Sequence, residues 1–365
     1  KEFLEEKLKS GEQLKLYTGY DPTAPTLHIG NGITLMKLRQ FQKLGHKIIM
    51  LIGDFTGMIG DPTDKGSARQ QLSREEVLEN CREYQKQASA ILDFDGDNPV
   101  ELKFNSEWLS KMNFAEILEL TSHFTVQRML ERDMFQVRIN DEKPIYLHEF
   151  LYPVMQGYDC VYMDVDGEVG GNDQTFNMLA GRTLMKEMKD KEKFVLTTKL
   201  LTDTAGNKMG KSEGNMIAFS DSPEDMYGKV MRWSDEMIIN GFELCSNVDM
   251  DEIKKMEEEM KQGVNPRDFK LKLAYEITKA FLGEEAAKKG EKHFAGVIQK
   301  KEKPEEMPEI KPSTYDVATA LMEAELAKSK TEVRKLIEQG GVKLNDKPIE
   351  DLNTEVKPED IIQKG

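Results

Sequence analysis

Cysteine, histidine and long apolar runs are scarce in this chain of 365 residues. Its three cysteines, Cys81, Cys160 and Cys245, stand far apart, so they predict neither a disulfide framework nor a zinc site. The five histidines are scattered, and we expect no structural metal. No apolar run approaches the ~20 residues that a membrane span requires. These absences favour a cytoplasmic protein without a membrane partner.

Positive charge is also in deficit. The net charge of −15 argues against a protein that coats nucleic acid, although local basic patches can still bind RNA. The first residues, KEFLEEKLKSGEQ, have the pattern of a charged amphipathic helix and not that of a signal peptide. With 38% hydrophobic residues over this length, we expect two or three globular domains.

The first recognisable unit is a strand, a loop, a helix and a second strand. Leu14–Tyr17 reads as a buried strand, apolar residues recur at helical spacing over 33–44, and KIIMLI at 47–52 is too apolar to face water. His28 and Asn31 therefore stand at a helix N-terminus, beside the carboxyl end of a strand. Open α/β sheets bind ligands at that edge, and the unpaired N–H groups of a helix start suit phosphate.

Two glycine-containing loops carry cations. Residues 53–72 are glycine-rich and read as an active-site loop that contains Lys65 and Arg69. Residues 202–215 contain the string KMGKS, which presents Lys208 and Lys211 beside a hydroxyl. An ordinary surface loop would explain either one by itself.

A polar stripe marks the helix predicted at 146–159. Tyr152, Gln156 and Asp159 recur at i, i+4 and i+7, so they share one face of an otherwise apolar helix. Such a stripe needs partners or a ligand. Both a buried hydrogen-bond network and a binding site remain open on this pattern.

Further elements follow from periodicity and capping signals. They are a helix at 73–92, a strand at 100–105, helical structure from Ser106 to Asp133 with Ser106 and Ser122 as caps, a strand at Val161–Val165, a helix at 175–185, helices from 222 to about 300, helices at 317–321 and 332–339, and strands at 342–344 and 361–363.

Composition divides the chain into domains. We expect a Rossmann-like parallel-sheet domain at 1–220 with a helical insertion near 106–165, a helical domain at 221–298, a charged proline-containing linker at 299–311 and a small α+β unit at 312–365.

Taken together, the motifs resemble the bacterial tyrosyl-tRNA synthetases, class I enzymes with a C-terminal S4-like RNA-binding domain, along essentially the whole chain. The matching strings, in the order of the family, are YTGYDPT at 17–23, HIGN at 28–31, GDP at 60–62, the stripe on 146–159, Gly171-x-Asp173-Gln174, KMGKS at 208–212 and SKTEVRKLIEQGGVKLN in the tail.

The resemblance implies a two-step reaction. L-Tyrosine and ATP, with Mg²⁺, would give tyrosyl-adenylate and pyrophosphate, and the tyrosyl group would pass to the terminal ribose of tRNA(Tyr). It also implies a homodimer formed through the inserted segment.

The resemblance implies roles for the residues of this chain that match the family motifs. By resemblance, Tyr17 and Asp159 hold the substrate hydroxyl, Asp61, Tyr152 and Gln156 its ammonium, and Gln174 lies near its carboxylate. The ATP site would comprise Asp21, Thr23, His28, Gly30, Asn31, Thr34 and Asp173, and the pyrophosphate would contact Lys65, Arg69, Lys208, Lys211 and Ser212.

The chain departs from the family pattern in places. Asn31 replaces the usual histidine, Gly210 replaces a serine, and Thr18 stands where many relatives have cysteine. The unit at 312–365 has eight basic residues against eleven acidic ones, so it is not basic overall. Its cations cluster, and we expect this set to contact RNA: Lys328, Lys330, Arg334, Lys335, Lys343 and Lys347.

Two rivals remain. A tryptophanyl-tRNA synthetase shares the architecture, but Tyr17 and Asp159 suit a phenol. An RNA-binding scaffold or splicing factor derived from a synthetase is the other, although such a protein has no need of Lys208, Lys211 or Asp61.

Overall fold

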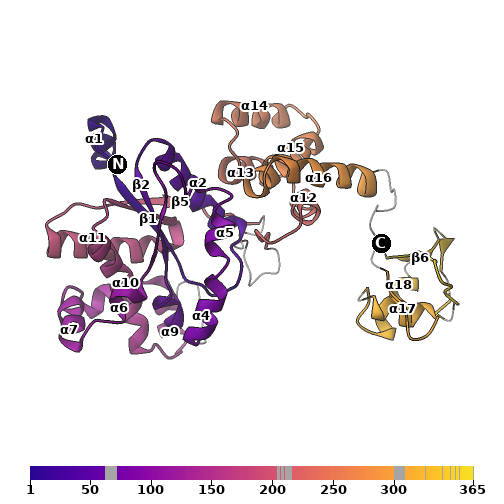
Figure 1. The fold of residues 1–365 in the computed structure, drawn as a ribbon, viewed down its shortest axis with the longest axis horizontal. Helices are drawn as coiled ribbons and strands as arrows, with labels where there is room; N and C mark the ends of the chain where they lie inside the picture. Colours follow the sequence, from indigo (N-terminus) through magenta and orange to yellow (C-terminus); the bar gives the residue numbers. More distant parts are fainter. Residues whose placement is uncertain are drawn as a thin grey trace. The chain divides into compact units, whose positions relative to one another are not determined.

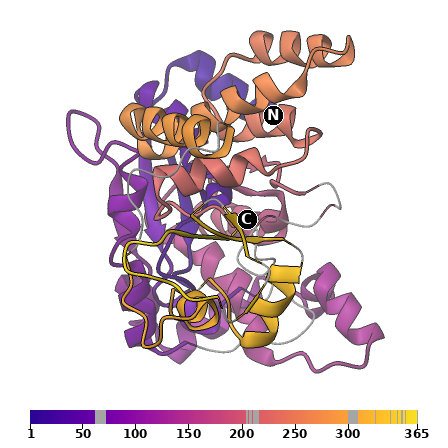
Figure 2. The same ribbon diagram turned by 90° about the vertical axis from the view of Figure 1, so that its right-hand side faces the viewer.

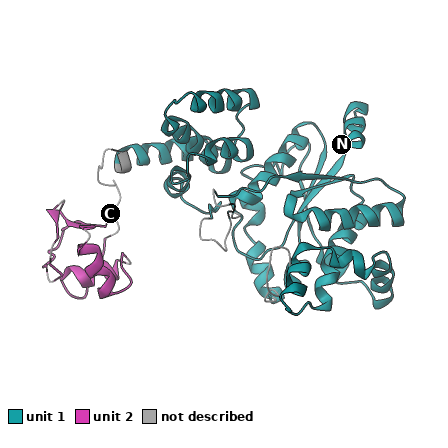
Figure 3. Ribbon diagram, turned by 180° about the vertical axis from the view of Figure 1, so that it is seen from behind, with its two compact units in different colours: residues 1–299 teal, residues 300–365 magenta. Residues whose placement is uncertain are grey.

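The chain forms two compact units, residues 1–299 and residues 300–365 (Figure 3). The computed structural model describes residues 1–61, 72–203, 206, 209, 216–299, 309–324, 326–338, 340–345, 347–349, 351–352 and 354–364. Within these residues, every helix is too short or too polar to cross a membrane.

A parallel sheet of five strands, in the order β3-β2-β1-β4-β5, forms the centre of the first unit (Figure 1). The strands are β1 Lys15–Tyr20, β2 Lys47–Ile52, β3 Glu101–Phe104, β4 Gly167–Gly171 and β5 Phe194–Thr198. The sequence order reverses between β1 and β4, because β2 and β3 lie on one side of β1 while β4 and β5 lie on the other. In sheets of this kind the crevice at the carboxyl ends of the two central strands binds ligands.

Helices surround the sheet and form two further groups (Figures 1 and 2). Those up to the last strand are α1 Glu2–Ser10, α2 Ile29–Lys43, α3 Thr56–Ile59, α4 Arg74–Cys81, α5 Tyr84–Ala88, α6 Ser106–Leu109, α7 Phe114–Ser122, α8 Val126–Leu130, α9 Asp133–Asn140, α10 Leu147–Met163 and α11 Thr175–Lys189. The later ones are α12 Pro223–Met231, α13 Met237–Cys245, α14 Met250–Lys261, α15 Pro266–Leu282 and α16 Glu284–His293, with a π-helical turn at Phe294–Gln299.

Helix α2 is fixed between the sheet and the later helices. Its apolar side chains, Ile33, Leu35 and Leu38 among them, are buried in the main core. Gly32 faces the ring of Phe281 from α15 so closely that a Cβ at position 32 would overlap it. The start of α2, which faces the ligand-binding edge, is therefore held from two sides.

The strands at 47–52 and 342–344 and the helical character of 222–299 are confirmed. The single helix predicted at 73–92 is wrong, since α4 and α5 are separated by a turn. Between 106 and 133 there are three short helices, and their side-chain caps are Asn113 and Thr125, not Ser106 or Ser122.

The strand predicted at Val161–Val165 is wrong as well. Helix α10 continues to Met163 and ends at Asp164, which has a left-handed backbone conformation with φ 52°. The strand that follows is β4, Gly167–Gly171, which begins after this turn. Short apolar runs of this kind suit a buried helix as well as a strand. Strand β5 was not predicted.

The second unit has its own small core. It contains α17 Val317–Glu323, α18 Lys330–Glu338 and an antiparallel sheet of three strands in the order β7-β6-β8: Val342–Leu344 (β6), Lys347–Pro348 (β7) and Ile362–Lys364 (β8). The string Ser329-Lys330-Thr331-Glu332 predicts a capping box at the start of α18, and Ser329 Oγ accepts from the Glu332 N–H as that motif requires. The Glu332 carboxylate reaches one residue further back than expected, to the Lys328 N–H.

Candidate active site

A cavity of about 400 Å³ opens at the carboxyl ends of β1 and β4. It gathers residues from the first strand, the start of α2, the buried face of α10 and the turn after β4. The predicted site residues that line it are Tyr17, Asp21, Thr23, His28, Gly30, Asn31, Thr34, Asp61, Tyr152, Gln156, Asp159, Asp173 and Gln174. Five others, Lys65, Arg69, Lys208, Lys211 and Ser212, lie outside the described residues.

The start of α2 is fixed by a reciprocal cap. The Gly30 N–H donates to His28 Nδ1 at 3.1 Å, and the His28 N–H donates to Asn31 Oδ1 at 3.0 Å. Asn31 therefore closes the first turn of the helix, and the cap specifies its oxygen as the acceptor. The arrangement leaves the helix N-terminus facing the cavity without a bulky side chain at Gly30.

Met209, the described residue of KMGKS, lies beside the HIGN turn. Met209 is buried, lines the cavity, and donates its N–H to the Leu201 carbonyl at 2.9 Å. The Met209 carbonyl lies 3.9 Å from where a Cβ on Gly30 would be. The described part of KMGKS thus packs against the HIGN turn, as two parts of one nucleotide site would.

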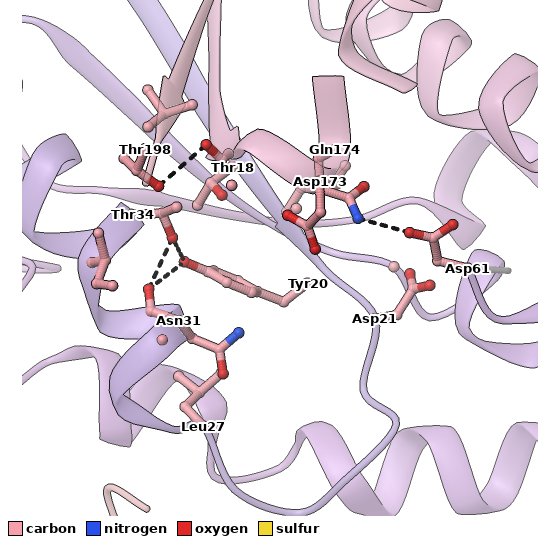
Figure 4. Close-up of a pocket in the computed structure, with 18 of the residues that line it drawn as sticks. Thr18, Tyr20, Asp21, Leu27, Asn31, Thr34, Asp61, Asp173, Gln174 and Thr198 are labelled. Carbon is pink, nitrogen blue, oxygen red and sulfur yellow. Dashed lines mark hydrogen bonds between the residues drawn. The ribbon is translucent and has the colours of Figure 1, made fainter. Parts of the chain in front are cut away.

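Beside this turn, a hydroxyl network secures the first strand to α2. Tyr20 donates its hydroxyl to the Asn31 carbonyl at 3.1 Å, and Thr34 Oγ1 donates to the same carbonyl at 2.8 Å (Figure 4). Burial raises the pKa of Tyr20 to about 12, so the phenol stays protonated. Thr34 faces the cavity but is already hydrogen-bonded within the protein.

Asp159 and Tyr17 are the two least exposed of the predicted residues that line the cavity, and we call this part its closed end. Both side chains are buried, at 2% and 0% exposure. Asp159 accepts from Trp108 Nε1 at 2.7 Å and from Asn105 Nδ2 at 3.3 Å. Burial raises the pKa of Asp159 well above the usual carboxyl range, against the lowering effect of these two hydrogen bonds. The Tyr17 hydroxyl lies 3.0 Å from Cys160 Sγ.

Sequence reasoning missed Asn105 and Trp108. Both lie just after the carboxyl end of β3, in or next to the strand predicted at 100–105, and that position was the signal available. Because Asp159 lies far along the chain from both residues, the sequence does not indicate that they are hydrogen-bonded to it. Trp108 is further held by stacking on Tyr162, with ring centroids 4.4 Å apart.

Two carboxylates, Asp61 and Asp21, line what we call the middle of the cavity, and each is hydrogen-bonded to another side chain. Gln174 Nε2 donates to Asp61 Oδ2 at 2.7 Å, on the wall shown in Figure 4. Arg132, which the sequence did not single out, lies 3.5 Å from the other oxygen of Asp61. The Tyr152 hydroxyl donates to Asp21 Oδ2 at 2.7 Å. This stretch combines negative charge with hydrogen-bond acceptors, which suits an ammonium group.

Comparisons with known proteins agree with this geometry. The family model for tRNA synthetases class I (W and Y) matches residues 9–299, and that for the S4 domain matches residues 318–362. The tyrosine–tRNA ligase of Thermotoga maritima is 46% identical over 361 residues, which are 98% of this chain and 89% of that protein. The tyrosine–tRNA ligase of Haemophilus influenzae is also 46% identical, over 95% of this chain and 86% of its own length.

The chain belongs to the tyrosine–tRNA ligase family. Its members are aminoacyl-tRNA synthetases, so this chain is an enzyme of that class, and the scaffold and tryptophanyl alternatives are disfavoured. A truncated mitochondrial tyrosyl-tRNA synthetase of Coccidioides posadasii has the same fold, with a TM-score of 0.66 at 25% identity over 80% of this chain and 86% of that one. The Archaeoglobus fulgidus tyrosyl-tRNA synthetase complexed with L-tyrosine matches in fold with a TM-score of 0.62 at 22% identity, over 80% of this chain and 94% of that one.

The raised pKa of Asp159 predicts how stability depends on pH. Unfolding exposes the carboxyl, which then ionises near its ordinary value of 3.8, while the folded protein retains the proton to higher pH. The favourable contribution of this group is therefore present below that value and is lost as the pH rises towards the folded pKa. We predict that raising the pH from about 4 to about 8 changes the free energy of unfolding of Asp159→Asn, relative to that of wild type, in favour of the variant. Unfolding in urea at the two pH values measures this difference. An equal difference at both pH values would contradict the raised pKa.

Proposed function

We propose that the chain activates L-tyrosine with ATP and transfers the tyrosyl group to tRNA(Tyr). The observation that carries this proposal is the buried pair of Tyr17 and Asp159 at the closed end of a cavity whose other end is the start of α2. A phenol hydroxyl can both donate and accept, so it can satisfy two such polar groups. A phenylalanine ring would leave both without a substrate partner, which costs free energy in a buried site.

The remaining contacts support a fixed orientation of the amino acid. Asp61, Tyr152 and Gln156 face the middle of the cavity and would hold the ammonium, with Gln174 beside the carboxylate. The carboxylate would then point towards α2, where ATP would bind. Attack of the carboxylate on the α-phosphate needs no protein nucleophile, because alignment of the reactants supplies much of the rate.

ATP, entering as its Mg²⁺ complex, would lie with its phosphates at the start of α2. The backbone N–H groups there, the partial positive charge of the helix and the small residue Gly30 suit a phosphate chain. Thr23, His28 and Asn31 would contact the phosphates, with Asp21, Thr34 and Asp173 towards the ribose. Lys65, Arg69, Lys208, Lys211 and Ser212 would stabilise the charge that develops on the departing pyrophosphate.

The cytoplasm is the compartment we propose for this reaction. Cys81, Cys160 and Cys245 are free thiols in the structure, as a reducing compartment requires.

The test of the proposed activity is amino-acid-dependent exchange of pyrophosphate into ATP. We expect exchange with tyrosine and none above background with phenylalanine or tryptophan. We also expect Asp159→Asn to raise the KM for tyrosine by about tenfold or more, since it alters the acceptor for the substrate hydroxyl, while the KM for ATP changes less than about twofold.

The matched control is Asp164→Asn, at the end of the same helix and outside the cavity. It should match wild type. Exchange driven by tryptophan, or by none of the three amino acids, would overturn the proposal.

A homodimer through the inserted segment is supported by its apolar surface. Leu147 at the start of α10 is 85% exposed, Phe114 of α7 is 73% exposed and Val126 of α8 is 66% exposed. Exposed large apolar side chains gathered in one segment are typical of protein interfaces.

We predict that Leu147→Asp yields monomers in sedimentation velocity, because a carboxylate placed in an apolar interface is desolvated without a partner. Leu44→Asp is the control, since Leu44 is also exposed, at 69%, but lies at the far end of α2. A dimeric Leu147→Asp variant, or a monomeric wild type, would contradict this interface.

The S4-like unit is proposed to bind tRNA through its basic residues. Helix α18 buries Val333 and Ile337 and exposes Arg334 and Lys335, and the other expected cations are exposed too: Lys328, Lys330, Lys343 and Lys347. Phosphate contacts depend on such local clusters and not on the net charge of a domain.

We predict that Arg334→Gln with Lys335→Gln raises the KM for tRNA in aminoacylation and flattens its salt dependence, while pyrophosphate exchange stays at the wild-type rate. The control removes two exposed lysines outside the cluster, Lys311→Gln with Lys357→Gln. Equal effects of the two double variants would argue against a specific RNA-binding face.

A further inference from the structure

A buried ion pair to which we have given no role lies at the wall of the amino-acid cavity. Glu168 of β4 and Lys193, just before β5, are both 2% exposed and form a hydrogen-bonded salt bridge. Lys193 Nζ also donates to the Met178 carbonyl at 3.0 Å and lies 6.0 Å from the centre of the Tyr17 ring. Glu168 lines the cavity.

Helix α11 leaves room for this ion pair at a glycine. Gly181 of α11 faces it, and a Cβ there would lie 2.9 Å from Lys193 Nζ and 2.6 Å from Cys160 Sγ. A larger residue at this position would therefore require the Lys193 ammonium or the Cys160 thiol to shift. Buried ion pairs add little net stability compared with apolar residues of similar size, so stability alone is a weak reason for this arrangement.

Glu168 contacts a residue that faces the substrate. The Gln156 amide donates from Nε2 to Glu168 Oε1 at 2.9 Å. An ionised carboxylate only accepts hydrogen bonds, so it admits the NH₂ group of Gln156 and not the carbonyl. Burial lowers the pKa of Lys193, but its interactions with Cys160 and Glu168 outweigh this effect and the pKa is raised, so the lysine remains a cation beside Glu168.

The amide of Gln156 has two ends, and the choice between them matters for an ammonium ligand. With its NH₂ group held by Glu168, the carbonyl oxygen is the end available to the cavity. A carbonyl accepts from an ammonium, whereas an NH₂ group turned to the same place would oppose it.

We propose that Glu168, held by Lys193, is a positioning residue that turns the carbonyl of Gln156 towards the substrate ammonium. The pair then contributes to amino-acid recognition without touching the substrate ammonium itself. This inference rests on the proposed function, since it requires that Gln156 hold the ammonium of tyrosine.

The test reverses the polarity of the pair while retaining its opposite charges. In the double variant Glu168→Lys with Lys193→Glu, the group next to Gln156 becomes a donor, so the amide must turn its carbonyl away from the cavity. Binding is measured for tyramine, which carries the phenol and the ammonium, and for 4-ethylphenol, which carries the phenol alone. Both are titrated as competitors of tyrosine in pyrophosphate exchange, or directly by calorimetry where exchange is too slow.

We expect the inhibition constant of tyramine to rise by about tenfold or more, while that of 4-ethylphenol changes less than about twofold. A merely structural role would weaken both ligands alike or neither, and either result would overturn the proposal. A neutral double variant, Glu168→Leu with Lys193→Met, repeats the comparison if the reversed pair fails to fold. It should show a smaller loss for tyramine alone, because Gln156 is released and not reversed.

Lys191→Met is the matched control. Lys191 lies two residues away and pairs with Asp166 at 2.9 Å outside the cavity, so both ligands should bind as in wild type. Measurements on the wild-type protein distinguish a failure of the proposed function from a failure of the role proposed for Glu168. If it fails to bind tyramine more tightly than 4-ethylphenol, the proposed function fails. If it binds tyramine preferentially and the reversed pair retains that preference, only the role of Glu168 fails.

Discussion

The cavity depends on hydrogen bonds to the carboxyl group of Asp159, a residue that is only 2% exposed. An isolated buried carboxylate is very costly, so its oxygens need donors. Asn105, just after β3, and Trp108 of α6 provide them, and these hydrogen bonds link α10 to the segment that follows β3. Once α10 is held there, Tyr152 and Gln156 on the same face come to line the same cavity.

The two ends of the cavity are built by different means. The closed end uses buried side chains with internal partners: Asp159 with Trp108, and Gln156 with Glu168 and Lys193. The open end uses backbone, namely the start of α2, capped by His28 and Asn31. Side chains held in this way discriminate between similar amino acids, whereas backbone N–H groups recognise a phosphate chain that every nucleotide carries.

The local structure at the centre of the site could be predicted from the sequence. The strand, loop, helix and strand of residues 14–52 have periodicities that leave little choice, and the spacing of Tyr152, Gln156 and Asp159 placed them on one face. Strand β5 was missed, and Val161–Val165 was assigned to a strand, because short apolar runs do not distinguish a buried helix from a strand. Arg132, Glu168 and Lys193 gave no signal, since their partners are distant in the sequence and their roles arise only from tertiary contacts.

We propose that the cavity is one amino-acid site with a phenol end and an ammonium end. A crystal structure of this chain with L-tyrosine tests it most directly. We predict the phenol oxygen within about 3 Å of both Tyr17 and Asp159, and the ammonium within the same distance of Asp61, Tyr152 and the Gln156 carbonyl. Tyrosine bound in the reverse orientation, or outside this cavity, would contradict the account.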